Sequence, residues 1–268
     1  MADKSIARMR VTEPKAFDLD KCDPGETFGW RKAAAAIELL DVKAELDKLQ
    51  QRFAAENRRS LLLILQARDA AGKDGTVRAI FSGLNPAGVR VTSFKVPAGR
   101  EASQDYLWRV HAACPADGEI AVFNRSHYED VLVVRVKELA PASVWEKRFR
   151  HINEFERMLS DEGTTIIKCY LNVSKAQQAE RFQERLDDPM KSWKFRAGDL
   201  ADRDLWPKFQ SAYEEAIRET STSHAPWHVV PADRNWVRNL AVAKILLDAL
   251  KKLDPQFPPP DPAIKDVK

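Results

Sequence analysis

The segment from residue 61 to residue 76 constrains this chain more than any other. It begins with five apolar residues, 61–65, which indicate a buried strand. A turn of small residues that contains Gly72 and Lys73 follows, and residues 76–81 can begin a helix. Such a turn presents backbone N–H groups to an anion, the helix dipole favours negative charge, and the lysine adds a positive charge. The segment therefore predicts a phosphate-binding loop.

The loop departs from the standard pattern of phosphate-binding loops at two positions. Ala67 stands where that pattern has its first glycine, and Asp74 stands where it has a magnesium-binding Ser or Thr. The alternative is an ordinary turn between a strand and a helix. An ordinary turn does not need a lysine, an aspartate and two glycines close together, so phosphate binding is the favoured interpretation.

Strands and helices alternate along the rest of the chain. Apolar patterns predict strands at 61–65, 89–96, 119–123, 164–173 and 227–230. They predict helices at 32–56, 101–113, 144–160, 175–186, 204–220 and 233–253, and Ser174 and Asp233 are expected to cap two of them. This alternation predicts an α/β fold with a mostly parallel sheet and helices on both faces.

Ligands of such sheets bind at the carboxyl ends of the strands. The loops at 66–75, 94–100 and 124–130 all follow predicted strands, so they should gather at one edge of the sheet. We expect this edge to hold the site.

The length of 268 residues fits one large domain. Residues 1–30 contain prolines and glycines with little periodicity, which is typical of an irregular arm on the surface. We expect the main domain to span 31–253. Residues 254–268 are proline-rich and are expected to form an extended or loose tail.

Composition argues against several classes of protein. No apolar run approaches the length of a membrane span, and the first residues contain no apolar secretion segment. Three widely spaced cysteines have no metal-binding spacing, and a net charge of +3 gives little indication of nucleic acid. We expect a cytoplasmic protein with reduced thiols and without membrane or nucleic-acid partners.

Lys73 is the clearest candidate for chemistry. A cation is poorly placed at a helix N-terminus unless it serves a ligand, so we expect its ammonium group to contact phosphate. A solvated lysine at the start of the helix is the alternative. The loop groups expected to bind the nucleotide or its phosphates belong to Ala70, Ala71, Gly72, Gly75 and Thr76.

Two aspartates flank these groups. Asp69 would repel phosphate unless it bound a magnesium ion, received a proton or oriented the acceptor. A turn aspartate that accepts a backbone N–H is the simpler alternative. Asp74 could bind a water of the magnesium ion, or could simply favour the first helical turn.

Asn124 and Arg125 follow the predicted strand at 119–123. Many phosphate-loop enzymes have an acidic residue here that helps to hold the metal. Asn is a weak metal ligand, but its amide can bind phosphate, water or a base. Arg125 is expected to bind phosphate through its forked guanidinium group. His127 is expected to be structural, and the carboxylates of residues 129 and 130 are expected to be solvated.

A third group of cations lies between residues 181 and 203. We expect this segment to form a helical lid that closes over the transferring phosphates and excludes water. A mixed-charge surface helix is the alternative. The cations expected to bind nucleotide or phosphate are Arg181, Arg185, Lys191 and Lys194.

Three segments together resemble polyphosphate kinase family 2. They are QARDAAGKDGT at 66–76, FNRSHYED at 123–130 and DPMKSWKF at 188–195, and the likeness runs from about residue 30 to 250. The resemblance implies a phosphate-loop kinase-like fold and phosphoryl transfer between inorganic polyphosphate and a nucleotide, with Mg²⁺. It gives central roles to Asp69 and Lys73, and a phosphate contact to Arg125.

The hypothesis from sequence is a reversible polyphosphate-dependent kinase that forms ATP from ADP, and ADP from AMP. Its expected catalytic residues are Asp69, Lys73 and Arg125, with Asp69 also the expected Mg²⁺ ligand. Asn124 stands where most members of the family have Asp. In this respect the chain resembles the subgroup that accepts both nucleoside monophosphates and nucleoside diphosphates. The alternatives are an ATP-dependent kinase of the same fold and a non-catalytic nucleotide-binding module. A homo-oligomer, dimer or tetramer, is expected through the arm and the first helix.

Overall fold

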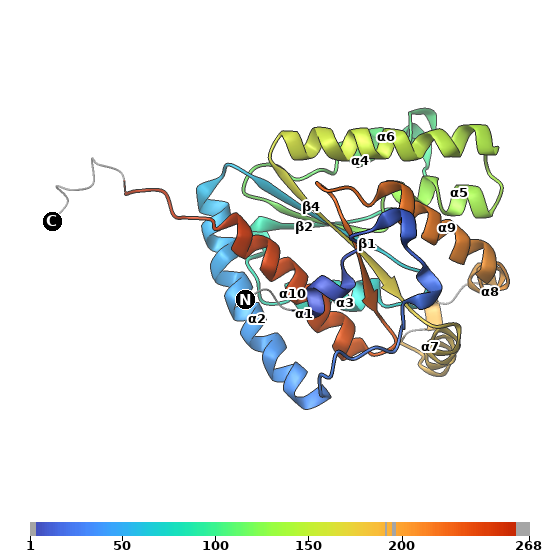
Figure 1. Cartoon of the computed structure of the whole chain (residues 1–268), viewed down its shortest axis with the longest axis horizontal. Coiled ribbons are helices and arrows are strands. Elements are labelled where there is room, and N and C mark those ends of the chain that lie inside the picture. The colour runs from blue at the N-terminus through green and yellow to red at the C-terminus, as the bar shows by residue number, and fades with distance from the viewer. Residues whose placement is uncertain (1–3, 191, 195–196, 261–268) are drawn as a thin grey trace.

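The computed structural model describes residues 4–190, 192–194 and 197–260 (Figure 1). Within them, five parallel strands form one sheet in the order β2-β3-β1-β4-β5. The strands are β1 (Ser60–Gln66), β2 (Val89–Ser93), β3 (Ile120–Asn124), β4 (Thr164–Asn172) and β5 (Trp227–Pro231). The predicted α/β fold with a parallel sheet is confirmed.

Strand β1 is the centre of the sheet. All seven of its residues are buried, because β3 and β4 pair with its two edges and helices cover both faces. Leu61, Leu63 and Leu65 point to one face of the sheet, whereas Leu62 and Ile64 point to the other. A continuous apolar run was needed here because neither face meets water.

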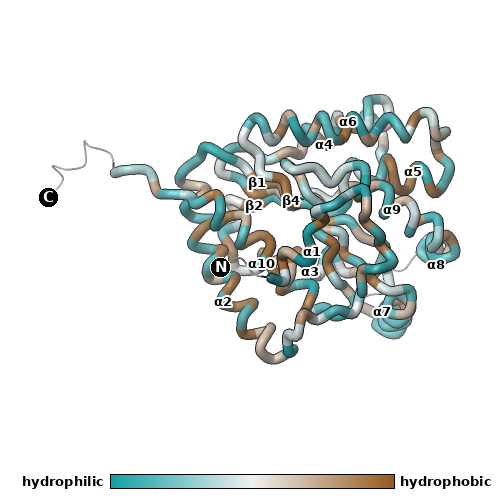
Figure 2. Tube along the Cα trace, viewed as in Figure 1, coloured by the Kyte–Doolittle hydropathy of each residue, from teal (hydrophilic) through white to brown (hydrophobic). Residues whose placement is uncertain are grey.

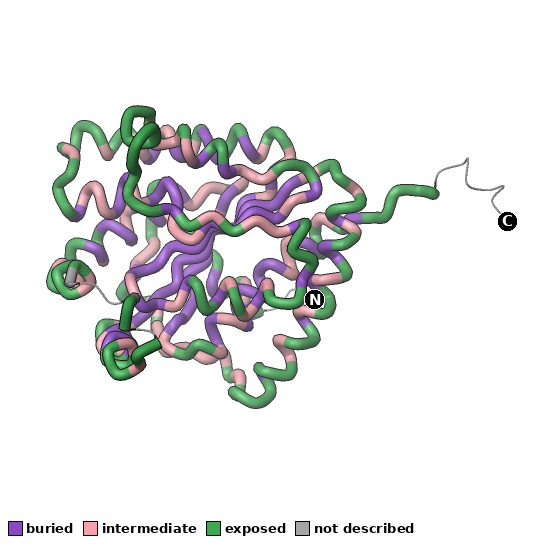
Figure 3. Tube along the Cα trace, turned by 180° about the vertical axis from the view of Figure 1, so that it is seen from behind, coloured by how far each residue is buried: buried purple, intermediate pink, exposed green. Residues whose placement is uncertain are grey.

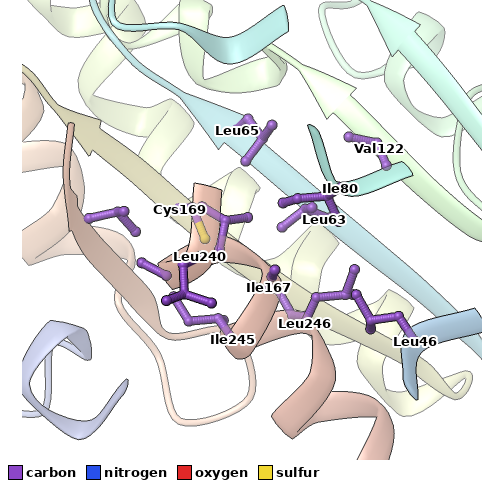
Figure 4. Packing of buried hydrophobic residues seen from close by; sticks show 14 of the residues in the cluster. Leu46, Leu63, Leu65, Ile80, Val122, Ile167, Cys169, Leu240, Ile245 and Leu246 are labelled. Carbon is purple, nitrogen blue, oxygen red and sulfur yellow. The ribbon is translucent and has the colours of Figure 1, made fainter. Parts of the chain in front are cut away.

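Two helical layers cover the sheet. On one face, α2 (Lys32–Glu56), α3 (Lys73–Phe81) and α10 (Asn235–Leu253) pack against the strands, as the side chains of Figure 4 show. On the other face lie α6 (Ala142–Asp161) and α9 (Trp206–Thr220). Figure 2 and Figure 3 show hydrophobic, buried segments in the middle and hydrophilic, exposed helix faces outside.

Five further helices and six 3₁₀ turns complete the described elements. The helices are α1 (Lys4–Met9), α4 (Trp108–His111), α5 (Val133–Val136), α7 (Lys175–Asp187) and α8 (Ala197–Asp204). The 3₁₀ turns are Pro14–Ala16, Leu19–Lys21, Pro86–Gly88, Gly99–Ser103, His127–Asp130 and Ser192–Lys194. In the described part of the chain, no helix has the length and apolarity needed to cross a membrane.

The topology places one crevice at the edge of the sheet. From β1 the chain runs to β2 on one side, whereas from β3 it crosses to β4 on the other side. The loops that leave β1 and β3 therefore separate, and ligands of open parallel sheets bind at such a point. These loops are the segments that follow Gln66 and Asn124.

Several predicted elements differ from the observed ones. The predicted helix at 101–113 is a 3₁₀ turn followed by α4, because Asp105 accepts from the backbone N–H groups of Leu107 and Trp108 and begins a new helix there. Asp233 accepts from the N–H of Ser174 and does not cap α10. Ser174 caps α7 as predicted.

Other boundaries shift by a few residues. Helix α3 begins at Lys73 and not near residue 76, and β2 ends at Ser93 and not at residue 96. Residues 254–260 of the predicted tail form neither helix nor strand, and residues 261–268 lie outside the described range.

A buried ion pair lies between the sheet and α6. The ammonium group of Lys168 donates to Glu156 Oε2 (2.6 Å), Tyr128 Oη (2.8 Å) and Thr220 O (2.7 Å). Both charged side chains are fully buried. Burial opposes ionisation of the carboxyl group, but Lys168 and His127 together outweigh it and lower the pKa of Glu156. Tyr128 belongs to the turn that follows β3, so the network supports that turn.

Replacing Glu156 with Gln should destabilise the protein by about 3–5 kcal/mol, because it leaves the buried charge of Lys168 without a partner. Unfolding in urea measures this loss. The double variant Glu156→Gln/Lys168→Met should recover part of it. Glu154→Gln, an exposed neighbour on the same helix, should change little. Equal stability of the Glu156 and Glu154 variants would contradict this role of the pair.

Candidate active site

The loop after β1 has two residues in the left-handed region. Ala70 has φ 60° and Gly72 has φ 100°. At Gly72 a Cβ atom would also lie 2.0 Å from the Nη1 atom of Arg238. Only glycine satisfies both conditions, since a side chain would be strained and would collide with the guanidinium group.

Two buried arginines hold the loop from behind. Arg181 and Arg238 both donate to the carbonyl oxygen of Ala71, at 3.1 Å and 2.8 Å. Arg181 also donates to Ala70 O (3.0 Å) and Ala232 O (2.6 Å). With the loop carbonyls turned toward the arginines, the opposite side of the loop is left for an anion. Burial, together with the charge of Arg181, lowers the pKa of Arg238 to about 9.

The position of Arg181 corrects the sequence analysis, which placed it in a lid over the phosphates. It is buried beneath the loop because five acceptor atoms surround its guanidinium group there. Sequence reasoning missed Arg238 altogether. Its only signal was an arginine on the apolar face of the last helix, between Val237 and Leu240.

Lys73 begins α3 and its side chain turns back into the loop. Its Nζ atom donates to Ala67 O at 2.8 Å and lies 3.4 Å from Arg68 O. Lys73 is only 9% exposed, which rules out the solvated lysine at a helix start. Burial, with the charge of Arg125 adding to it, lowers the pKa of Lys73 to about 8.

Asp69 and Arg125 meet across the crevice between the loops, as the predicted topology required. The Nη2 atom of Arg125 lies 2.6 Å from Asp69 Oδ1, and its Nη1 atom lies 3.5 Å from Glu129 Oε2. Burial alone would raise the pKa of Asp69, but Lys73 and Arg125 outweigh it and lower that pKa. Asp69 therefore carries its charge at neutral pH.

The backbone of Arg125 is held in an unusual conformation. Its φ is 63°, a left-handed value that is rare for a residue with a side chain. Its N–H donates to Leu65 O at 3.1 Å, which ties the two loops together. Non-glycine residues in this region concentrate at functional sites.

The two carboxylates after His127 are not solvated, contrary to the sequence analysis. Glu129 is half-buried beside Arg125, and burial raises its pKa. Asp130 is buried and accepts from Arg148 Nη1 at 3.1 Å. The 3₁₀ turn His127–Asp130 turns both side chains inward. His127 is buried there, in keeping with the structural role expected of it.

The polar residues at the start of α3 form contacts within the protein. Asn124 Nδ2 donates to Asp74 Oδ1 at 2.6 Å, which joins the end of β3 to the first turn of α3. The hydroxyl group of Thr76, expected at the phosphate, is buried and donates to Gly72 O at 3.1 Å. Gly75 lies in the first turn of α3, where a Cβ would be 3.3 Å from Arg238 Nη2.

The segment predicted as a lid contains the end of α7, a 3₁₀ turn and α8, beyond the carboxyl end of β4 (Figure 1). Arg185 lies over the ring of Phe182, and its charge contributes to the lowered pKa of Asp69. Lys191 lies outside the described residues, as does the side chain of Lys194.

Comparison with known proteins agrees with this geometry. The family model described as Polyphosphate kinase 2 (PPK2) matches residues 30–258. The chain belongs to the polyphosphate kinase 2 family.

Two curated relatives and one solved structure extend the match. An AMP/ADP-polyphosphate phosphotransferase of Meiothermus ruber is 55% identical over 98% of this chain and 99% of its own length. An ADP-polyphosphate phosphotransferase of Rhodopseudomonas palustris is 41% identical over 96% of this chain and 93% of its own. The crystal structure of polyphosphate kinase 2 from Arthrobacter aurescens matches with a TM-score of 0.93 at 44% identity, covering 97% and 93% of the two chains.

Gly72→Ala should damage the loop more than an equivalent change elsewhere. Gly83 offers the control, because it has φ 93° and open space around it. Gly83→Ala should cost only the left-handed strain, about 1–2 kcal/mol in urea unfolding. Gly72→Ala should cost more and should weaken tripolyphosphate binding, measured by calorimetry, at least about tenfold. Equal effects of the two changes would show that Arg238 does not constrain the loop.

Proposed function

We propose that the chain transfers a phosphoryl group between inorganic polyphosphate and ADP or AMP, forming ATP or ADP. The observation that carries this proposal is the contact of Asp69 with Arg125 at the crevice between β1 and β3, with the ammonium group of Lys73 held inside the same loop. The names of the relatives from Meiothermus ruber and Rhodopseudomonas palustris support these acceptors. Since one phosphoanhydride bond breaks as another forms, the reaction runs in both directions.

The residues would act mainly through position and charge. Lys73 and the loop N–H groups neutralise the condensed phosphate, and Arg125 stabilises the charge on the group in transfer. Asp69, which carries its charge, holds Arg125 in place and orients the attacking nucleotide phosphate. The terminal phosphoryl group of the polymer moves to the nucleotide, and the shortened polymer leaves with its electron pair.

Mg²⁺ is the cofactor we propose. Magnesium is usually held by one or two carboxylates together with substrate phosphates and water. Among the described residues no three His, Cys, Asp or Glu side chains gather as a metal cage, and Asp69 is the carboxylate that fits the shared arrangement. When bound, the ion would supply positive charge to the phosphates.

Acceptance of both AMP and ADP fits the amide at position 124. Asn124 donates to the carboxylate of Asp74, so the pair carries one negative charge. A carboxylate at 124 would face Asp74 at the same distance and add a second charge near the acceptor. With only one negative charge, the pair repels the phosphates of AMP and of ADP less than two carboxylates would.

A coupled assay tests the proposal. Protein, ADP, Mg²⁺ and polyphosphate, with no ATP supplied, should produce ATP. Lys73→Ala should lower kcat/KM by about 100- to 1,000-fold, because it removes a charge from the transfer site. Lys48→Ala, an exposed lysine of α2, should retain full activity. ATP formation only with an ATP donor would favour an ordinary kinase, and none at all by the folded protein would favour a binding module.

The lowered pKa of Lys73 predicts a pH dependence. As pH rises through about 8, the free enzyme loses the proton of Lys73, and the site loses one positive charge. The value of kcat/KM for polyphosphate, which reports groups of the free enzyme, should therefore fall above pH 8. In Lys73→Arg the fall should disappear even if activity is lower, because Arg stays charged. The same fall in both proteins would remove Lys73 as its cause.

We propose a homo-oligomer built on α2. Ile37 and Leu40 on this helix are 64% and 66% exposed, and the exposed Ala33 and Ala44 extend the same stripe. An antiparallel copy of α2 would set Ile37 against the partner subunit's Leu40, and a two-fold axis repeats that contact. Sedimentation should give a dimer or tetramer that Leu40→Glu dissociates; an unchanged oligomer would exclude this face.

We also propose a cytoplasmic location. Cys22, Cys114 and Cys169 are free thiols, and cytosolic conditions keep thiols reduced.

A further inference from the structure

Arg68 is a buried cation that the phosphate loop alone does not explain. It precedes Asp69, is only 7% exposed, and its guanidinium carbon lies 3.5 Å from the ring centre of Trp206. Its Nη2 atom donates to Gln210 Oε1 at 2.5 Å, while its Nε atom has no hydrogen-bond partner among the described residues. A buried guanidinium with an unused donor usually has a function, because leaving such a donor unpaired is costly.

The surroundings of Arg68 identify the ligand chemistry. The side chain lines a cavity that Asp69, Arg125, Trp206 and Tyr213 also line. Three carboxylates line the same cavity, but each is already paired: Asp69 and Glu129 with Arg125, and Asp202 with Lys137. An incoming anionic oxygen is therefore the chemistry that suits the unused donor of Arg68.

The N-terminal arm supports this arginine through one glutamine. Gln210 accepts from Arg68 with its oxygen and donates to Asp20 Oδ1 with its nitrogen at 2.8 Å. The amide group can do both at once, because its oxygen accepts from the cation while its nitrogen donates to the carboxylate. Asp20 belongs to the turn Leu19–Lys21 of the arm.

The arm is fastened along the same helix. Glu214 Oε2 accepts from the N–H of Leu19 at 2.9 Å, and Arg218 Nε donates to Phe17 O at 2.7 Å. Residues 210, 214 and 218 are four apart, so they form one row along α9. Trp206, which stacks on Arg68, begins this helix directly after α8. The arm, α9 and the phosphate loop thus form one connected unit.

We propose that Arg68 is a further cation of the transfer site that binds condensed phosphate, and that Asp20 and Gln210 are its positioning residues. The arm then takes part in substrate binding through the chain Asp20–Gln210–Arg68. This inference rests on the proposed function for the identity of the anion. The carboxylate of Asp20, on the surface of the arm, thereby affects how tightly the buried site on the domain binds condensed phosphate.

Calorimetry with inorganic tripolyphosphate tests the inference, independently of turnover. Asp20→Ala and Gln210→Ala should each weaken binding about 3- to 10-fold, because Arg68 loses its fixed orientation. Asp20→Asn keeps an acceptor oxygen and should restore most of the affinity. Glu13→Ala, another exposed carboxylate of the arm, is the control and should bind as the original protein does.

A double-mutant cycle separates positioning from general stability. Arg68→Ala should weaken binding at least about tenfold, and Asp20→Ala should then have no further effect. Full additivity of the two changes, or equal affinity of the Asp20→Ala and Glu13→Ala proteins, would overturn the inference. Turnover of the unmodified protein with polyphosphate and ADP is measured separately, so a failure there counts against the proposed function and leaves the affinity result standing.

Discussion

The carbonyl oxygen of Ala71, held between Arg181 and Arg238, is the interaction on which the site depends. Both guanidinium groups donate to this one atom from behind the loop. Their approach is possible because Gly72 has no side chain to meet Arg238. These hydrogen bonds fix the orientation of the peptide group that contains this carbonyl. Lys73 then begins α3 with its ammonium group inside the loop. The two buried charges also make the loop attractive to an anion.

The other charged side chains of the site form pairs with one another, and substrate phosphates can take the place of one partner. Arg125 lies between Asp69 and Glu129, so its guanidinium group is oriented before any ligand arrives. Asn124 restrains Asp74 through a single hydrogen bond. Groups that are fixed in advance do not need to reorganise during the reaction, which is the main way in which such sites lower a barrier. The buried pair of Lys168 and Glu156 contacts Tyr128 and so adds rigidity to the turn after β3.

The sheet and its loop were predictable because they depend on local patterns. A short apolar run without alternation is typical of a strand covered on both faces, and the glycine turn with a lysine after it favours a phosphate-binding loop. The meeting of Asp69 with Arg125 was also predictable, because loops that follow parallel strands share one edge. The family relationship, read from three short segments, holds across residues 30–258.

The parts that sequence did not predict depend on contacts between distant segments. Arg238 lies in the last helix and reaches the loop only after the chain has folded. Arg181 looked like a surface cation because its acceptors lie in the phosphate loop and after β5, far from it in the sequence. Asp130 looked solvated for the same reason, since nothing local indicates that Arg148 will meet it. The chain from Asp20 to Arg68 joins segments separated by most of the sequence.

A crystal structure of the protein with tripolyphosphate tests the central claim most directly. We expect phosphate oxygens within hydrogen-bond distance of the loop N–H groups and of Lys73 Nζ, with Arg181 and Arg238 still bound to the carbonyl of Ala71. An empty loop beside phosphate bound elsewhere, or a loop that binds phosphate only after both arginines have left Ala71, would contradict the account.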